Sequence, residues 1–262
     1  MTDRARGTSN AFSVQHSHFW CDTLDGIRLA GTRLGEDPHT AVIVVHGFMG
    51  YRTKPRWRIL SQGLARRFSV LTFDLRGHGQ SGGACTGGED EAMDVHAVVE
   101  YARAHGFERV VTVGGSLGGI AVVREAAIYQ DPDAVVAIST PARWDPTGTK
   151  AVRRATWLFT SGVGRTLARG LMGTRINLTW HQPEAPVDLV GKIAPIPLLI
   201  VHGENDHFFP ARAAEELHRA AGDPKQLWIL PGFGHAEDGF TDAFADRLAG
   251  HIDQMLVTAG SR

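Results

Sequence analysis

Short apolar runs alternate with longer amphipathic segments along most of this chain, and this alternation limits the possible folds more than any other feature. Runs such as residues 41–45 and 134–138 are apolar throughout and rich in β-branched residues, which is typical of strands buried on both faces. Strands separated by helical segments predict a mostly parallel sheet with helices on both sides. We therefore expect an α/β fold with a central sheet of about eight strands. The expected strands are 17–22, 27–34, 41–45, 69–73, 109–113, 134–138, 196–201 and 226–230, and the expected helices are 55–67, 91–104, 117–129, 211–220 and 240–257.

Residues 141–192 interrupt this alternation. They contain three of the six tryptophans, a pair of adjacent arginines and several glycines. We expect a small, mainly helical lid here, inserted after the sixth strand between two parts of one core, residues 1–140 and 193–262. A length of 262 residues suits one α/β domain with one insertion.

Composition excludes several classes of protein. The formal net charge of −1 provides no electrostatic basis for binding nucleic acid or an anionic membrane. Two cysteines, Cys21 and Cys85, are too few for a disulfide framework. The first ten residues are polar, unlike a signal peptide, and no apolar run approaches the roughly 18 residues of a membrane span. These features lead us to expect a cytoplasmic protein.

The strongest motif is the G-x-S-x-G pattern at residues 114–118, centred on Ser116. It follows a predicted strand and precedes a predicted helix, which is the context that this motif needs to form a sharp turn. Small residues at Gly114 and Gly118 let the chain fold back without a clash. The turn would present the Ser116 hydroxyl near a helix N-terminus, where developing negative charge is favoured. Ser116 is therefore the candidate nucleophile.

A serine hydroxyl needs a base to become a good nucleophile at neutral pH. His235, in a glycine-rich loop after the last predicted strand, is the candidate base. The base in turn needs a carboxylate that fixes its tautomer. Asp206, just past the 196–201 strand, is at the carboxyl edge of the sheet, where ligands bind in such folds. Glu204 is a local competitor for this role.

The segment His46-Gly47-Phe48-Met49-Gly50 follows the 41–45 strand. A tetrahedral oxyanion needs two donors that are already in place. We expect these donors to be the backbone amides of Phe48 and Leu117. A second loop, residues 74–81, contains Asp74 and Arg76, which we interpret as structural residues that bond neighbouring backbone.

These segments together resemble the α/β-hydrolase family. The elbow around Ser116, the H-G-F-x-G loop, the D-x-R-G-x-G-x-S loop, and the G-x-x-D and G-H pair occur in that family's order across roughly 27–257, except the lid. The resemblance implies a triad of Ser116, Asp206 and His235, with Phe48 and Leu117 as oxyanion donors. One departure is Gly115, where many relatives carry histidine. Haloalkane dehalogenases and epoxide hydrolases of this fold use an aspartate nucleophile, so Ser116 argues against both.

The expected reaction is hydrolysis of a carboxylic ester of an apolar or aromatic small-molecule acyl group through an acyl-enzyme. Candidate substrate-binding residues are Met49, Trp144, Trp157 and Trp180, and the competing interpretation is that the lid aromatics only pack onto the core. The lid arginines would favour an anionic acyl group or carrier, or form a solvated helix face; they are Arg153, Arg154, Arg165 and Arg169.

Alternatives stay open at this point. The same triad suits a thioesterase, an acyltransferase or a carbon–carbon bond hydrolase, and a ligand-binding protein with little turnover would keep the fold. An enzyme that acts at a lipid surface is a further alternative, but apart from the lid tryptophans no exposed amphipathic segment of this chain requires it. No motif implies a metal or organic cofactor, and the expected partner is a small acyl substrate, with no nucleic acid and no membrane. The chain would be a monomer or a homodimer.

Overall fold

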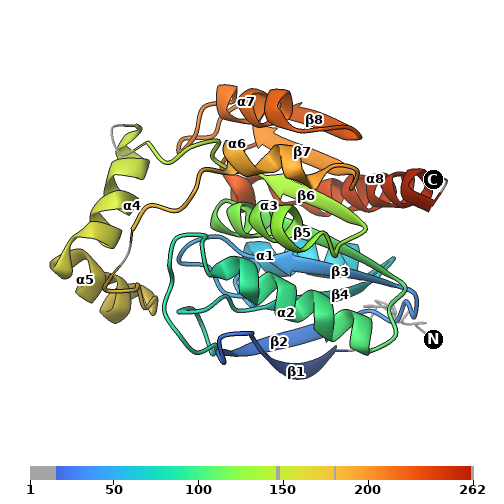
Figure 1. Ribbon diagram of the computed structural model, residues 1–262, viewed down its shortest axis with the longest axis horizontal. Coiled ribbons are helices and arrows are strands. Elements are labelled where there is room, and N and C mark those ends of the chain that lie inside the picture. The colour runs from blue at the N-terminus through green and yellow to red at the C-terminus, as the bar shows by residue number, and fades with distance from the viewer. Residues whose placement is uncertain (1–15, 146–147, 180, 261–262) are drawn as a thin grey trace, which may run out of the picture.

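A computed structural model describes residues 16–145, 148–179 and 181–260. Its centre is an eight-stranded sheet in the order β1-β2-β4-β3-β5-β6-β7-β8 (Figure 1). The pairs β1–β2 and β2–β4 are antiparallel, and the remaining neighbours are parallel. The predicted α/β fold with a mostly parallel sheet is therefore confirmed. The strands are β1 (His16–Asp22), β2 (Arg28–Leu34), β3 (Thr40–Val45), β4 (Ser69–Phe73), β5 (Arg109–Gly115), β6 (Ala134–Ile138), β7 (Leu198–Gly203) and β8 (Lys225–Leu230).

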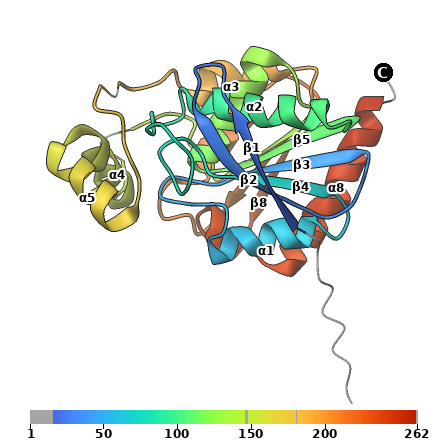
Figure 2. The ribbon, with the colours of Figure 1, turned by 90° about the horizontal axis from the view of Figure 1, so that it is seen from below.

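Helices cover both faces of this sheet. Helices α2, α3 and α7 pack on one face and α1 and α8 on the other (Figures 1 and 2). None of the helices in the described part of the chain is both long and apolar enough to cross a lipid bilayer. The helices are α1 (Pro55–Leu64), α2 (Glu91–Ala104), α3 (Leu117–Tyr129), α4 (Lys150–Thr160), α5 (Gly162–Met172), α6 (Pro186–Leu189), α7 (Arg212–Ala220) and α8 (Asp242–Gly260), with short 3₁₀ turns η1 (Val190–Ile193) and η2 (Ala236–Gly239).

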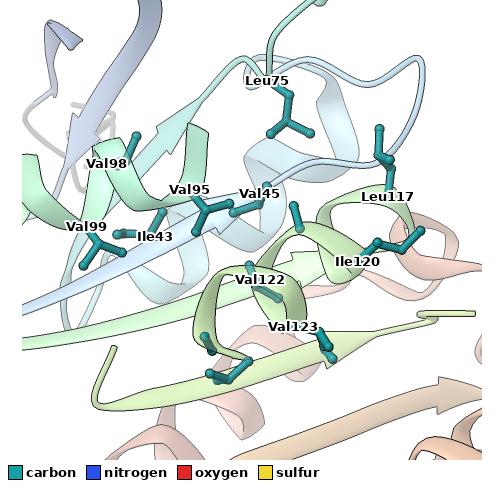
Figure 3. Close-up of a cluster of buried hydrophobic side chains, with 14 of the residues drawn as sticks. Ile43, Val45, Leu75, Val95, Val98, Val99, Leu117, Ile120, Val122 and Val123 are labelled. Atoms are coloured by element: carbon teal, nitrogen blue, oxygen red, sulfur yellow. The ribbon is translucent and has the colours of Figure 1, made fainter. Parts of the chain in front are cut away.

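The central strands are apolar throughout because both of their faces are buried. In β3, Ile43 and Val45 point to the layer that contains α2 and α3, whereas Val42 and Val44 point to the layer of α1 and α8. Figure 3 shows the first of these layers, where β3 side chains meet Val95 of α2 and neighbours from α3. The sheet is thus held rigidly from both sides.

Some element boundaries differ from the predicted ones for identifiable reasons. The strand predicted from residue 196 begins at Leu198, because Pro197 has no N–H to donate to a neighbouring strand. The last helix begins at Asp242 because the Thr241 hydroxyl accepts a hydrogen bond from the Phe244 amide and caps the helix. The first helix ends at Leu64, three residues before its predicted end.

Helices α4 and α5 form a helical pair beyond the end of the sheet (Figures 1 and 2); we call residues 148–179 the helical insertion. Two sets of bonds attach it to the core. Near its start, the Thr149 hydroxyl donates to the Phe208 carbonyl over 2.9 Å. Near its end, the Arg175 amide donates to Gly77, and the Cys85 amide donates to Arg175. The insertion is therefore fixed at both ends to loops of the core.

Candidate active site

Ser116 occupies a sharp turn between β5, which ends at Gly115, and α3, which begins at Leu117. Its backbone has φ 54° and ψ −116°, in a region that residues with a side chain seldom adopt. A Cβ on Gly114 would lie 2.2 Å from the Gly118 carbonyl oxygen, and one on Gly118 would lie 2.3 Å from the Val45 oxygen. Only glycine fits at these two positions, so the G-x-S-x-G spacing follows directly from the closeness of the turn.

Gly115, the departure from the family pattern, also has a structural cause. A Cβ at this position would lie 2.8 Å from the tip of the Trp57 indole. Trp57 is fully buried, and its Nε1 donates a hydrogen bond to Glu237, so the ring has little room to move. The indole fills the space that a side chain at position 115 would need.

Asp206 and His235 are brought together by two loops at the carboxyl edge of the sheet. His235 Nδ1 donates to Asp206 Oδ2 over 2.8 Å, and the other oxygen, Oδ1, accepts from the amides of Phe208 and Phe209 over 2.8 and 3.0 Å. Burial raises the pKa of the Asp206 carboxyl, but the hydrogen bond and charge of His235 and the Phe209 amide outweigh it, so the pKa lies below its ordinary value. The buried carboxylate is thus ionised at neutral pH. Glu204, the predicted competitor, is exposed to solvent.

The loop that carries His235 is tied to the core on both sides. The Ala236 amide donates to the Ser139 hydroxyl over 2.9 Å. The Glu237 carboxylate accepts hydrogen bonds from Trp57 Nε1 and from Lys54 Nζ. Trp57 therefore contacts both the turn that carries Ser116 and the loop that carries His235.

The two parts of the site lie side by side. A Cβ built on Gly115 would lie 3.3 Å from the Ala236 Cβ, so the residues that adjoin Ser116 and His235 are in contact. The Phe208 ring lies 4.3 Å from the His235 ring and also lines the cavity that contains Ser116. The structure thus gathers Ser116, Asp206 and His235 at one edge of the sheet.

Two buried histidines shape the loop at residues 46–50. His46 Nδ1 donates to the Gly47 carbonyl, and its Nε2 accepts from the Leu75 amide over 3.0 Å. Burial lowers the pKa of His46 well below its ordinary value, so the imidazole is neutral and can accept this bond. His78 Nε2 likewise accepts from the Met49 amide. These bonds hold Gly47 against the nucleophile turn, where its Cβ would lie 3.2 Å from that of Ser116.

A cavity of about 40 Å³ opens at Ser116 between the sheet edge and α4. Its walls are almost entirely apolar. Of the predicted site residues, Phe48, Ser116, Leu117 and Trp144 line it. Sequence reasoning missed Phe208 and Phe209 as cavity residues, although an aromatic pair two residues after the candidate carboxylate was a usable signal. The lining residues are Phe48, Ser116, Leu117, Ile120, Pro141, Trp144, Val152, Ala155, Phe159, Phe208 and Phe209.

Two of the predicted substrate residues, Met49 and Trp157, do not line this cavity, and a third lies outside the described residues. Met49 is absent from its walls, and its amide is bonded to His78 instead. Trp157 is 45% exposed and lies beside Lys150 and the arginine pair on the outer face of α4. It is two residues from Phe159, so helical geometry places the two rings on different sides of α4. Trp180 lies outside the described residues.

The loop at residues 74–81 is a hydrogen-bonded support, as predicted. Asp74 accepts from the amides of Arg52 and Gln80 over 2.7 and 2.9 Å. Arg76 is buried, and its guanidinium pairs with the carboxylates of Asp94 and Asp25 rather than with neighbouring backbone as predicted. These residues fix the loop that holds His78, and hence the segment at residues 46–50.

Comparison with known proteins agrees with the fold described above. A family described as alpha/beta hydrolase fold matches residues 40–171. The uncharacterized protein YfhR of Salmonella typhimurium is 30% identical over 248 residues, which cover 90% of this chain and 79% of that protein. The uncharacterized protein Rv2307c of Mycobacterium tuberculosis is 30% identical over 235 residues, or 84% of this chain and 73% of that protein.

Two solved structures have the same fold. The Pyrococcus furiosus esterase Pf2001 has a TM-score of 0.73 at 20% identity, over 94% of this chain and 93% of its own. The alpha/beta hydrolase GrgF from Penicillium sp. sh18 has a TM-score of 0.72 at 20% identity, over 92% of this chain and 98% of its own. With the family match, the 30% identical relatives and the sheet order described above, this chain belongs to the α/β-hydrolase family.

Proposed function

We propose that this protein is a serine hydrolase that cleaves small carboxylic esters, with Ser116 as nucleophile, His235 as base and Asp206 as the group that orients the base. The observation that carries the proposal is the Asp206–His235 hydrogen bond beside a serine held at positive φ. A strained backbone of this kind persists only where the surroundings enforce it, and such residues cluster at active sites. The structural similarity to an esterase, Pf2001, supports the same reaction class.

The hydrogen bonding defines how the proton would move. His235 Nδ1 carries the hydrogen that bonds Asp206, which leaves the lone pair on Nε2 to accept the Ser116 proton. Ser116 Oγ attacks the acyl carbonyl, and the imidazolium then gives the proton to the departing alcohol. Water, deprotonated by the same Nε2, attacks the acyl-enzyme, and the acid leaves as Ser116 recovers its proton.

Two backbone amides would stabilise the oxyanion. Phe48 and Leu117 both border the cavity at Ser116. Within the described ranges, neither amide has a hydrogen-bond partner. Amides that are already oriented and unpaired stabilise developing charge without reorganisation, and loss of one such donor costs about 10² to 10³ in turnover in other enzymes. The Leu117 amide also lies at the first turn of α3, where the helix dipole favours negative charge.

The cavity indicates an acyl group that is apolar and small. Phenylalanine rings form much of its wall, and Phe159 of α4 packs against Phe48 with ring centroids 4.8 Å apart. None of the described residues that line it is basic, and the cluster of Lys150, Arg153 and Arg154 lies on the outer face of α4. The preferred acyl group is therefore uncharged.

The first test is labelling with a fluorophosphonate probe, followed by peptide mass spectrometry. The wild type and the exposed-serine control Ser17→Ala should both carry the probe on Ser116, and Ser116→Ala should carry none. A folded wild type that is not labelled would contradict the proposal and favour a ligand-binding protein without turnover.

A second measurement separates the ester and thioester reactions. The same short acyl group is offered as an oxygen ester and as a thioester, and kcat/KM is compared. We expect oxygen esters of acetate and propionate to be hydrolysed best, with a steep decline for longer chains. A large preference for the thioester would contradict the esterase assignment while leaving the nucleophile intact.

A further inference from the structure

A cluster of one histidine and three carboxylates joins α2 to α3 and has no part in the proposed reaction. His96 and Glu100 are one turn apart on α2, Glu125 is on α3, and Asp131 follows the end of α3. His96 Nδ1 lies 2.8 Å from Asp131 Oδ2 and 3.9 Å from Glu125 Oε1. One ligand atom from each of His96, Glu100 and Asp131 falls within a group no wider than 4.8 Å.

Glu125 is the unusual member of this cluster. Its side chain is fully buried, and neither of its oxygens has a hydrogen-bond partner among the described residues. A buried carboxyl group without a partner destabilises the folded state, because folding removes its hydrogen bonds to water and no protein group replaces them. Its Oε1 lies 3.9 Å from His96 Nδ1, the nitrogen that also faces Asp131.

The protein itself supplies little positive charge at this point. Arg124 is directed to Glu184, at 4.0 Å. Arg103 bonds the backbone oxygen of Asp131 and the carboxylate of Asp133. Across the described ranges, no lysine or arginine forms an ion pair with the three carboxylates of the cluster, so the imidazole of His96 is their one potential cationic contact.

We propose that His96, Glu100, Glu125 and Asp131 form a binding site for a divalent transition-metal cation, Zn²⁺ or Mn²⁺, that links α2 to α3. An imidazole nitrogen with carboxylate oxygens suits these ions, whereas Mg²⁺ and Ca²⁺ prefer oxygen alone. Metal–ligand bonds of about 2.0–2.2 Å place adjacent donors roughly 3–4 Å apart, close to the His96 separations given above. Glu100 is exposed and can rotate to complete the set.

The role of this site is structural. Ser116 precedes the first residue of α3, and Asp131 lies two residues after the last, so a helix of 13 residues, about 20 Å long, separates them. A cation at this site would neutralise the buried Glu125 carboxylate and fasten the two helices that cover one face of the sheet. It would raise thermal stability without changing turnover.

The test adds ZnCl₂ or MnCl₂ to chelator-treated full-length protein and measures binding by calorimetry and Tm by scanning calorimetry. The wild type should bind one ion and gain about 5 °C in Tm. The variant Glu125→Gln preserves the shape of the side chain but removes a carboxylate ligand, so it should lose most of this gain. The variant His96→Asn should lose it as well.

A matched control is available on the surface. His39 and Glu108 form an exposed histidine–carboxylate pair at 3.2 Å that contains none of the four proposed ligands. Glu108→Gln should therefore keep the full metal response. Absence of binding to the wild type, or an undiminished Tm gain in Glu125→Gln, would overturn the proposal. If Glu125→Gln fails to fold by circular dichroism, His96→Asn, whose side chain is partly exposed, decides the question in the same way.

Discussion

The sheet and the helical insertion differ in how far their side chains are buried. In the sheet, β3, β4, β6 and β7 are buried along their whole length, and apolar side chains pack on both faces. In the insertion, α4 and α5 have few buried side chains, and apolar residues such as Val163 and Leu171 are 65% and 78% exposed. The sheet edge carries the candidate chemical groups, whereas α4 contributes one wall of the cavity.

This difference in packing suggests that the sheet edge determines the rate of the reaction and the insertion determines which substrate is accepted. Reacting groups need positions fixed within a fraction of an ångström, which a sheet packed on two faces can supply. A pair of helices attached mainly through its ends and a few aromatic contacts can open at a lower free-energy cost than the sheet. We therefore expect substitutions at the sheet edge to change rates, and substitutions in the insertion to change which substrate is accepted.

The largest expected effect is at the sheet edge. Asp206→Asn keeps the shape of the side chain but disrupts the Nδ1–H bond that fixes the His235 tautomer, so kcat should fall by about 10⁴, as in other triads. Steady-state kinetics with an acetate ester measures this, and Glu204→Gln is the matched control because Glu204 is exposed on the same loop. Equal losses in both variants would show that Asp206 has no special role.

Hydrogen exchange should distinguish the two regions next. Amides of β3 and β5 should exchange only through global unfolding, whereas those of α4 and α5 should exchange about 10³ times faster through local opening. Exchange measured by mass spectrometry on peptides from 40–45 and 150–172 provides the comparison. Equal protection in the two peptides would mean that the insertion folds and unfolds with the sheet as one unit.

Two buried phenylalanines test the same contrast through stability. Phe73 of β4 and Phe159 of α4 are 0% and 1% exposed. Phe73→Ala should lower the free energy of unfolding by about 4 kcal/mol, the usual cost of such a cavity. Phe159→Ala should cost less than about 2 kcal/mol, because the helices around it can open separately. Denaturant unfolding measures both, and a Phe159→Ala cost as large as that of Phe73→Ala would argue against the contrast.

The last prediction concerns the contact between Gly115 and Trp57 at the sheet edge. Gly115→Ala should lower the free energy of unfolding by about 2 kcal/mol, because the new Cβ meets a ring that is held in place. The penalty should shrink when the same substitution is made in a Trp57→Phe background, where the ring is shorter. A double-mutant cycle measures this coupling, and strictly additive effects would show that the two sites are independent.

The sheet was predictable because burial on both faces leaves a strong local signal. Runs such as 41–45 and 134–138 are apolar throughout, and the motif around Ser116 depends on contacts between residues close in sequence. The pairing of Asp206 with His235 was also predictable, since both follow strands that end at the same sheet edge.

The cavity wall was harder to predict because it depends on how α4 is rotated against the core. Trp157 and Phe159 are both large and apolar, and only the docking of the helix decides that Phe159 faces Ser116 while Trp157 faces solvent. Trp57 illustrates the same limit. Its contact with Gly115 joins residues that are far apart in the sequence, and no local pattern indicates it.

The positive φ of Ser116 has a consequence for how this protein could evolve. A side chain at φ 54° is held against its own backbone preference, and glycine would relieve that cost. Selection for heat resistance alone would therefore favour glycine at the one position where the proposed reaction needs a hydroxyl. Any laboratory evolution of a more durable variant would have to select for turnover in every round.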